Sequence, residues 1–514
     1  MKLCGHVTLG LTGAIFVVLG VILIPKSMNA VLQFMVKEIM TICPCSQLYP
    51  SWKEPTSVIP LYQTFYFLEI ENPDEVSQGA KPKVKEVGPY VYNLTMHRDG
   101  GVWHLNDTVT YIQPIWYHFV ESLSVSSDDR VITTINFPLV AAISSSRNMS
   151  SGVQHFLAAL AQSTNSTLFR RLSIKEILWG YYDKFLHEAQ IFAGKKVIPS
   201  DHFGFLMGRN GTSNGLYNAY TGAGNYKDVA RIAYWNGTNS LNFWYSKWAN
   251  MINGTDGTMF HPFIDKSEIL YMFNPDTCRS LPYIFKEDAK YLDIPLHHYY
   301  LPPYVYANTT YHPENKEFCN SRCLFSGVFN ISQCLRGAPL GLSNPHFLYG
   351  SQDLQESVEG LNPNVSLHEN FFQVEPIMGM PYIFAERLQI NLFVEPYPFL
   401  SDMQNVPSFY FPFLWLEEKV TVRTEDAMKY KSTILVINTV VFALKIGLSI
   451  FGGCLILAAG TLLTRKIVYS SRERSVAKGS KQHLLSRNSD NSNHSNSNNS
   501  HMVVNERSPL LPTI

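Results

Sequence analysis

The chain has 514 residues, of which 46% are hydrophobic and 16% charged, a more apolar composition than is typical of a soluble protein. It carries 41 basic and 41 acidic residues, so the formal net charge is zero and no overall field attracts a polyanion. Composition therefore excludes a nucleic-acid-binding protein and directs attention to two apolar runs near the ends.

The first apolar run is long enough to cross a membrane. Residues 7–24 form a stretch of eighteen residues without a charge, and a helix needs about 20 mainly apolar residues to span a bilayer. A cleaved signal peptide is the alternative, but a helix-like segment over residues 27–40 continues the run. We expect a cytoplasmic N-terminus over residues 1–6 and a transmembrane helix over residues 7–28. Cys4 is a candidate for palmitoylation, with an unmodified thiol as the alternative.

The second apolar run covers residues 433–464 and is interrupted only by Lys445. We expect the bilayer span over residues 446–464, with Lys445 extending toward the interface. Six basic residues follow, which indicates a cytoplasmic tail under the positive-inside rule: Arg465, Lys466, Arg472, Arg474, Lys478 and Lys481. Two spans then leave residues 29–432 outside the cell or in a lumen.

Ten N-x-S/T sequons lie between the two spans. One sequon is weak evidence, but ten in a single loop indicate a glycosylated, extracytoplasmic domain. The acceptors are Asn93, Asn106, Asn148, Asn165, Asn210, Asn236, Asn253, Asn308, Asn330 and Asn364.

The cysteines between the spans fall into two groups. Cys43 and Cys45 flank a proline, and the sequence leaves open whether they form a strained local pair or free thiols. The second group consists of Cys278, Cys319, Cys323 and Cys334. Because an extracytoplasmic compartment is oxidising and the spacing does not fit a zinc site, we expect these four to form disulfides. Four cysteines allow three connectivities, and spacing does not select one.

In the extracytoplasmic segment apolar and polar residues alternate as they do in β-strands, and a helical insertion interrupts this pattern. Period-two patterns predict strands over residues 62–70, 81–95, 108–115, 131–135, 240–245 and 387–394. Helical patterns over residues 153–162 and 173–185 form the insertion, and Ser173 with Glu176 predicts a capping box. We expect one domain of α+β class, a long meander of strands interrupted at roughly 140–190.

Motifs for catalysis are absent from the sequence: it contains no convincing nucleophile elbow, metalloprotease, Walker or dinucleotide pattern. We therefore predict no enzyme activity, no cofactor and no metal site. His155 and Phe156 lie in the helical insertion and are candidate ligand contacts. In an acidifying compartment His155 would gain charge, although an ordinary surface histidine is the alternative.

The C-terminal tail, residues 465–514, is predicted to be disordered because it becomes polar and of low complexity, most clearly from Ser486 to Ser500. Near its end Glu506, Leu510 and Leu511 match an acidic dileucine signal, which a clathrin adaptor would recognise.

Several motifs in this order resemble the class B scavenger receptor family, of the platelet glycoprotein IV and lysosome membrane protein type. The resemblance covers the whole chain except the tail. The motifs are EVGPYVY at 86–92, ILWGYYD at 177–183, WNGTNSLNFW at 235–244, NMINGTDG at 250–257, CRS at 278–280, NPHFLYG at 344–350 and GLNPN at 360–364.

The resemblance implies a large antiparallel, β-barrel-like ectodomain with an apical helical bundle, anchored by two transmembrane helices. It also implies pairing of Cys278 with Cys334 and of Cys319 with Cys323. An apolar tunnel would carry sterol, fatty acid or phospholipid to the membrane from lipids and lipoprotein-like or protein ligands bound at the apex.

We thus predict a scavenger-receptor-like lipid receptor and transporter of lysosomal or late endosomal membranes, with the plasma membrane as a second location. A homo-oligomer is a further candidate state. The alternative function is a lysosomal sorting receptor for a luminal protein cargo.

Overall fold

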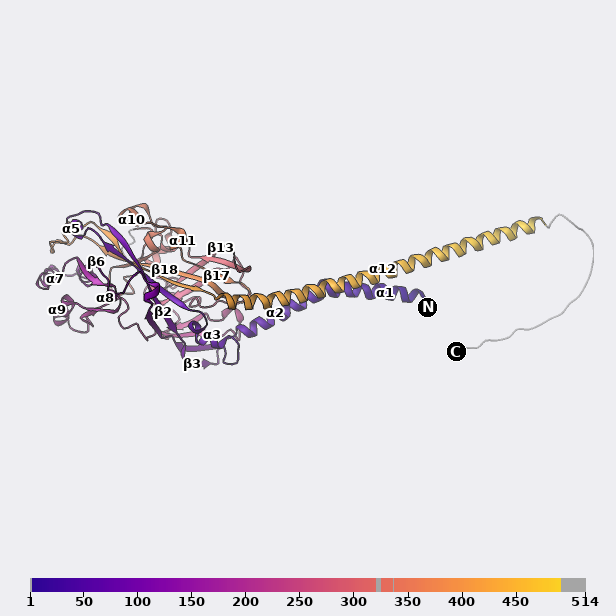
Figure 1. Ribbon diagram of the computed structural model, residues 1–514, viewed down its shortest axis with the longest axis horizontal. Helices are drawn as coiled ribbons and strands as arrows, with labels where there is room; N and C mark the ends of the chain where they lie inside the picture. Colours follow the sequence, from indigo (N-terminus) through magenta and orange to yellow (C-terminus); the bar gives the residue numbers. More distant parts are fainter. Residues whose placement is uncertain (1, 320–324, 336, 491–514) are drawn as a thin grey trace, which may run out of the picture. The chain divides into compact units, whose positions relative to one another are not determined.

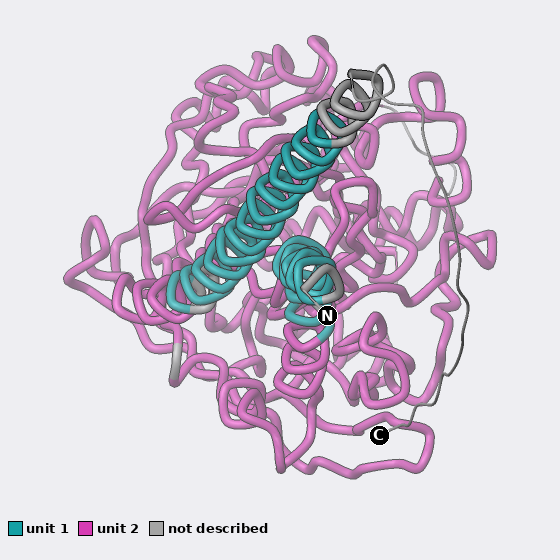
Figure 2. The backbone as a smooth tube through the Cα atoms, turned by 90° about the vertical axis from the view of Figure 1, so that its right-hand side faces the viewer, with its two compact units in different colours: residues 1–30, 435–514 teal, residues 31–434 magenta. Residues whose placement is uncertain are grey.

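The computed structural model describes residues 2–319, 325–335 and 337–490. They divide into two compact units, coloured separately in Figure 2. The first contains the chain up to residue 30 and from residue 435 onward, and the second contains residues 31–434.

The first unit is helical. It is built from α1 (Lys2–Val18), the π-helical turn η1 (Leu19–Leu23), the start of α2 (Ile24–Met40) and most of α12 (Thr424–Asp490). In the described chain, the helical stretches Gly5–Met40 and Thr439–Ser480 are long and apolar enough to cross a membrane. Helix α2 confirms the predicted continuation of the first run.

Within this unit α1 and α12 approach closely at two glycines. A Cβ atom added at Gly452 would lie 2.6 Å from the backbone oxygen of Gly13, and the rings of Phe16 and Phe451 meet edge to face at 5.1 Å. Small residues let helix backbones approach in an apolar solvent. The two candidate spans therefore pack against each other as a pair.

The prediction of disorder from residue 465 onward is wrong for the first half of the tail, because α12 continues to Asp490. Good helix formers such as Arg, Glu, Lys and Ala continue past the apolar run, and no proline interrupts the helix. Glu506, Leu510 and Leu511 lie outside the described residues.

The second unit is organised by a large antiparallel sheet. Eleven strands of the described chain form it, in the order β12-β13-β14-β17-β18-β19-β1-β2-β5, with β16 paired to β18 and β15 to β16. The strands are β1 (Leu61–Ile70), β2 (Val84–Met96), β5 (Ile115–Phe119), β12 (Leu270–Asn274), β13 (Arg279–Tyr291), β14 (Ile294–Tyr300), β15 (Phe329–Asn330), β16 (Leu340–Ser343), β17 (Phe371–Glu375), β18 (Met380–Val394) and β19 (Phe409–Thr421).

Smaller elements complete the unit. A four-stranded sheet contains β11 (Ile232–Trp235), β10 (Leu216–Tyr220), β4 (Thr108–Ile112) and β3 (Asp99–His104), and two strand pairs are β6 (Val131–Ile135) with β7 (Phe169–Ser173) and β8 (Tyr181–Tyr182) with β9 (His202–Phe203). Short helices are α3 (Tyr49–Lys53), α4 (Pro55–Val58), α5 (Pro73–Ser77), α10 (Gln352–Glu356) and α11 (Val365–His368). The 3₁₀ turns are η2 (Glu121–Leu123), η3 (Tyr226–Asp228), η4 (Pro275–Thr277), η5 (Pro303–Tyr306), η6 (Pro313–Phe318) and η7 (Pro345–Phe347).

The predicted helical insertion is present as α6 (Phe137–Ser146), α7 (Ser151–Ser163), α8 (Ile174–Trp179) and α9 (Lys184–Ala193). Helices α6, α7 and α9 contact one another. Figure 1 shows α7 and α9 at one end of the second unit, with α3 and β3 at the other. The insertion is therefore a local helical cluster at the end of the unit away from α3.

The capping box at the start of α8 is confirmed. The Ser173 hydroxyl accepts from the Glu176 backbone N–H at 3.2 Å, and the Glu176 carboxylate accepts from the Ser173 N–H at 2.8 Å. The prediction of one helix over 173–185 is wrong, because Gly180 adopts a φ of +117° that ends α8 before α9 begins.

Some of the predicted strands are present, and one is absent because a side chain forms hydrogen bonds with the backbone groups that a strand would need. The strands at 62–70 and 131–135 match β1 and β6. The prediction at 240–245 is wrong because the Asn250 amide binds both backbone groups of Trp244, at 2.9 and 2.7 Å. With those groups taken, only an isolated bridge at Ser240 remains.

Candidate functional site

Three neighbouring strands of the large sheet present two rows of side chains to the same face. In the first row Gln63 of β1 lies opposite Glu418 of β19, which lies opposite Glu386 of β18. Two residues further along β19, Val420 lies opposite Phe384. Because side chains alternate along a strand, these residues share one face of the sheet.

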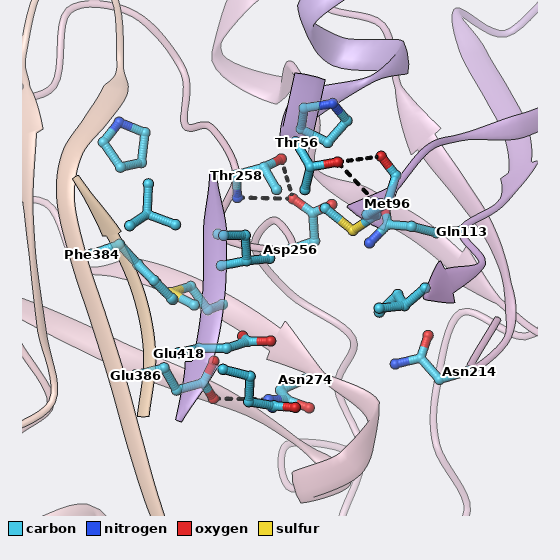
Figure 3. A pocket seen from close by; sticks show the side chains of 18 of the residues that line it. Thr56, Met96, Gln113, Asn214, Asp256, Thr258, Asn274, Phe384, Glu386 and Glu418 are labelled. Atoms are coloured by element: carbon cyan, nitrogen blue, oxygen red, sulfur yellow. Dashed lines mark hydrogen bonds between the residues drawn. The ribbon is translucent and has the colours of Figure 1, made fainter. Parts of the chain in front are cut away.

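This face lines a cavity of about 220 Å³. Residues of both edge strands, Ile115 of β5 and Met272 of β12, line the same cavity as the central strands, so the sheet curves around it. The apolar part of the lining is Ile59, Leu61, Met96, Ile115, Met272, Phe273, Met380, Pro381, Phe384 and Val420. Figure 3 shows polar side chains distributed among them.

One acid in the cavity wall has a cation beside it. Asp256 accepts from the Thr258 hydroxyl at 2.6 Å and forms an ion pair with the Arg98 guanidinium, whose side chain is 1% exposed. Burial alone would raise the pKa of Asp256, but Arg98 and Thr258 hold it below its usual value. Asp256 is therefore a charged, structurally compensated group.

The acids of the first row differ from Asp256. Glu386 accepts from the Asn274 side-chain amide at 2.8 Å (Figure 3). Among the described residues, neither Glu386 nor Glu418 has an ion-pair partner. Burial, together with repulsion from Glu386 and Asp276, raises the pKa of Glu418 to about 8, and burial also raises that of Glu386. The pair thus holds protons more tightly than ordinary carboxyls.

A separate apolar patch lies on the helical insertion. The rings of Phe156 on α7 and Phe192 on α9 meet edge to face at 4.9 Å, yet they are 39% and 64% exposed. Ile191 and Val197 are exposed beside them in sequence. An exposed apolar cluster of this kind is typical of an interaction surface.

The predicted ligand contacts His155 and Phe156 lie on α7, and neither lines the cavity. The ring of exposed His155 lies 4.2 Å from that of Phe399. The sequence thus directed attention to the helical patch, whereas the row of acids in the cavity was missed. The sequence signal that could have indicated this row is the presence of Glu386 and Glu418 at inward positions of otherwise apolar strands.

Two disulfides join pairs of described cysteines in the second unit. Cys278 is bonded to Cys334, the pair that the resemblance implies, and Cys43 is bonded to Cys45. Cys319 is also disulfide-bonded, but its expected partner Cys323 lies outside the described residues.

The sequon residues all have solvent access. Six acceptor asparagines are exposed and the other four are partly exposed, as glycan attachment requires. The exposed six are Asn106, Asn148, Asn165, Asn210, Asn236 and Asn364. Glycosylation remains a prediction, as does palmitoylation of Cys4, which lies in α1.

Sequence comparison with known proteins identifies the family of the chain. The sequence profile of the CD36 family matches residues 11–463. The chain belongs to the CD36 family. It is 31% identical over 451 residues to scavenger receptor class B member 1 of Cricetulus griseus, covering 88% of each chain.

A second kind of relative in the family is lysosome membrane protein 2. The Mus musculus protein is 35% identical over 398 residues, which is 77% of this chain and 80% of that one. The Homo sapiens protein is 34% identical over 420 residues, with 79% and 84% covered. Family membership and the two candidate spans make the chain a membrane protein. Both kinds of relative fit the predicted lysosomal, late endosomal or plasma-membrane location.

Proposed function

We propose that this protein is a receptor, rather than an enzyme, that binds lipids or lipid-bearing ligands and passes lipid through its curved sheet to the membrane. The cavity on the inner face of the sheet carries this proposal, because it combines an apolar lining with a few polar groups, as ligand sites do. An apolar route spares the lipid on the order of 0.8 kcal/mol for each methylene kept out of water.

The lining of the cavity by both edge strands supports a barrel-like ectodomain. In the sequence, residues 41–48 connect α3 to α2, which is the last part of the first candidate span. We therefore infer that the cluster of α6, α7 and α9, at the opposite end, is apical. In this arrangement a ligand would meet the helical cluster first and the cavity next.

The proposed topology keeps residues 1–6 and 465–514 in the cytoplasm and residues 29–432 outside it or in a lumen. Ten sequons with solvent access support this orientation. A clathrin adaptor reading Glu506, Leu510 and Leu511 would then direct the protein to late endosomal and lysosomal membranes. A homo-oligomer and a luminal protein cargo remain secondary proposals.

Capture of lipid particles by the apolar patch on the helical insertion can be tested by introducing charged side chains into it. We expect the double variant Phe156→Asp, Phe192→Asp to lose at least about tenfold in affinity for phospholipid particles, because aromatic anchors dominate binding at such surfaces. The measurement is the binding of fluorescent phospholipid–sterol particles to cells that display equal amounts of the full chain.

Tyr311→Asp is the matched control, since Tyr311 is 74% exposed in another segment. It should bind particles as the unaltered protein does. Equal binding by the double variant and the control would show that the patch takes no part in capture.

A further inference from the structure

The first row of the cavity wall is rich in hydrogen-bond acceptors that lack donors. Gln63 is 8% exposed and lines the cavity, and its Oε1 has no hydrogen-bond partner among the described residues. The same holds for Oε1 of Gln113, across the cavity. The Glu418 carboxyl makes no hydrogen bond or ion pair with a described side chain. A buried acceptor without a donor is costly, so an occupant that supplies donors would be favoured.

The chain itself does not supply the missing positive charge. The buried cation Arg98 is bound to Asp256, which lines the cavity. Arg209 donates to Asp276 at 2.7 Å and is held there. By contrast with Asp256, Glu386 and Glu418 face the cavity, and within the described part of the chain the only side-chain donor to either carboxyl is the Asn274 amide, which bonds to Glu386. A cationic ligand can therefore pair with an acid of this row in place of the proton that burial favours.

The spacing of the row fits a small cationic head. Neighbouring strands lie about 4.8 Å apart, so one nitrogen placed between two of these side chains can reach both at about 2.8 Å. A primary ammonium group carries three donors and no acceptor. Beyond this row Phe384, Val420 and Met272 offer an apolar surface for hydrocarbon.

We propose that Gln63, Glu418 and Glu386 form a head-group subsite for an amphiphile with a primary ammonium group, whose hydrocarbon lies against Phe384 and Val420. This inference rests on the proposed function, in which the cavity receives lipid, and it names the class of lipid. A fatty acid carboxylate is disfavoured at this row, since it supplies no donor to Gln63 and is repelled by either acid once that acid ionises.

The test uses the full chain in phosphatidylcholine nanodiscs and three photoreactive, clickable probes with the same eighteen-carbon chain: a primary amine, an alcohol and a carboxylic acid. Cross-linked peptides are mapped by mass spectrometry. We expect the amine to label peptides containing residues 61–63, 384–386 and 418–420 at least about tenfold more than the acid does.

Two variants test the carboxyls directly. Glu418→Gln combined with Glu386→Gln keeps the shape of the row and should lower amine labelling about tenfold, with alcohol labelling changed less than about threefold. Glu418→Lys supplies the ammonium from the chain and should shift labelling from the amine to the acid. The control Glu287→Gln removes an exposed carboxyl of β13 and should leave labelling by all three probes unchanged.

The outcomes separate the two proposals. Amine labelling that survives both variants, or acid labelling as strong as amine labelling in the unaltered protein, overturns the ammonium subsite and leaves a lipid cavity. Absence of cavity labelling by all three probes overturns the lipid function and the subsite together.

Discussion

Replacing Arg98 by methionine is expected to lower the free energy of unfolding of the second unit by about 3–5 kcal/mol, because it leaves a buried carboxylate without its cation. Arg98 donates to Asp256, to the Thr258 hydroxyl at 2.9 Å and to the backbone oxygen of Trp52. Its guanidinium also lies 5.5 Å from the ring centroid of Tyr111. One side chain thus joins four separate segments of the unit.

Chemical denaturation of the purified full chain, followed by tryptophan fluorescence, measures this loss. The matched control is Arg423→Met, which breaks the exposed pair between Arg423 and Asp426 and should cost less than about 1 kcal/mol. The double variant Arg98→Met, Asp256→Leu should recover part of the stability, since no unpaired charge remains. A cost for Arg98→Met no larger than for Arg423→Met would contradict the role assigned to the buried pair.

Filling the cavity is expected to reduce lipid transfer at least about tenfold, because a bulky side chain then occupies the space that the lipid needs. Val420→Trp adds an indole at a position that lines the cavity. The measurement is the rate at which fluorescent sterol passes from donor particles into vesicles that contain the full chain.

Thr421→Trp provides the control, since Thr421 is the next residue of β19 and is exposed. Side chains alternate along a strand, so the added indole points away from the cavity in this variant. Equal transfer rates for the two tryptophan variants would show that lipid does not use the cavity.

The sequence predicted the elements whose signal is local. Alternation over β1 and β6 and the Ser173–Glu176 capping box depend on residues close together in the chain, and the structure confirms them. The family was also correct, because several rare motifs occur in the expected order.

What the sequence could not predict depends on contacts between distant segments. Glu417 and Glu418 are adjacent and chemically identical, yet Glu417 binds Arg387 at 2.8 Å while Glu418 faces the cavity without a cation. Gln389 and Asn391 alternate with apolar residues along β18, yet both are 0% exposed, and their side-chain amides donate to the Ser343 hydroxyl of the paired strand β16. Only the register of the sheet distinguishes these cases.

The position of Gly180 illustrates a related limit. Its place in a helical pattern predicts only a small loss of helix stability, whereas in the structure its positive φ divides α8 from α9. That division allows α9 to pack on α7 and brings Phe192 to Phe156. The apolar patch therefore arises from a break that propensity alone does not require.

The proposed function requires residues 31–434 to enclose a lipid. The most direct measurement is mass spectrometry of lipid extracted from this segment after secretion and purification without detergent, followed by uptake of labelled sterol and fatty acid. We expect a stoichiometric lipid in the unaltered segment and at least about tenfold less in Val420→Trp. Absence of any bound lipid, together with failure to take up either label, would contradict the account.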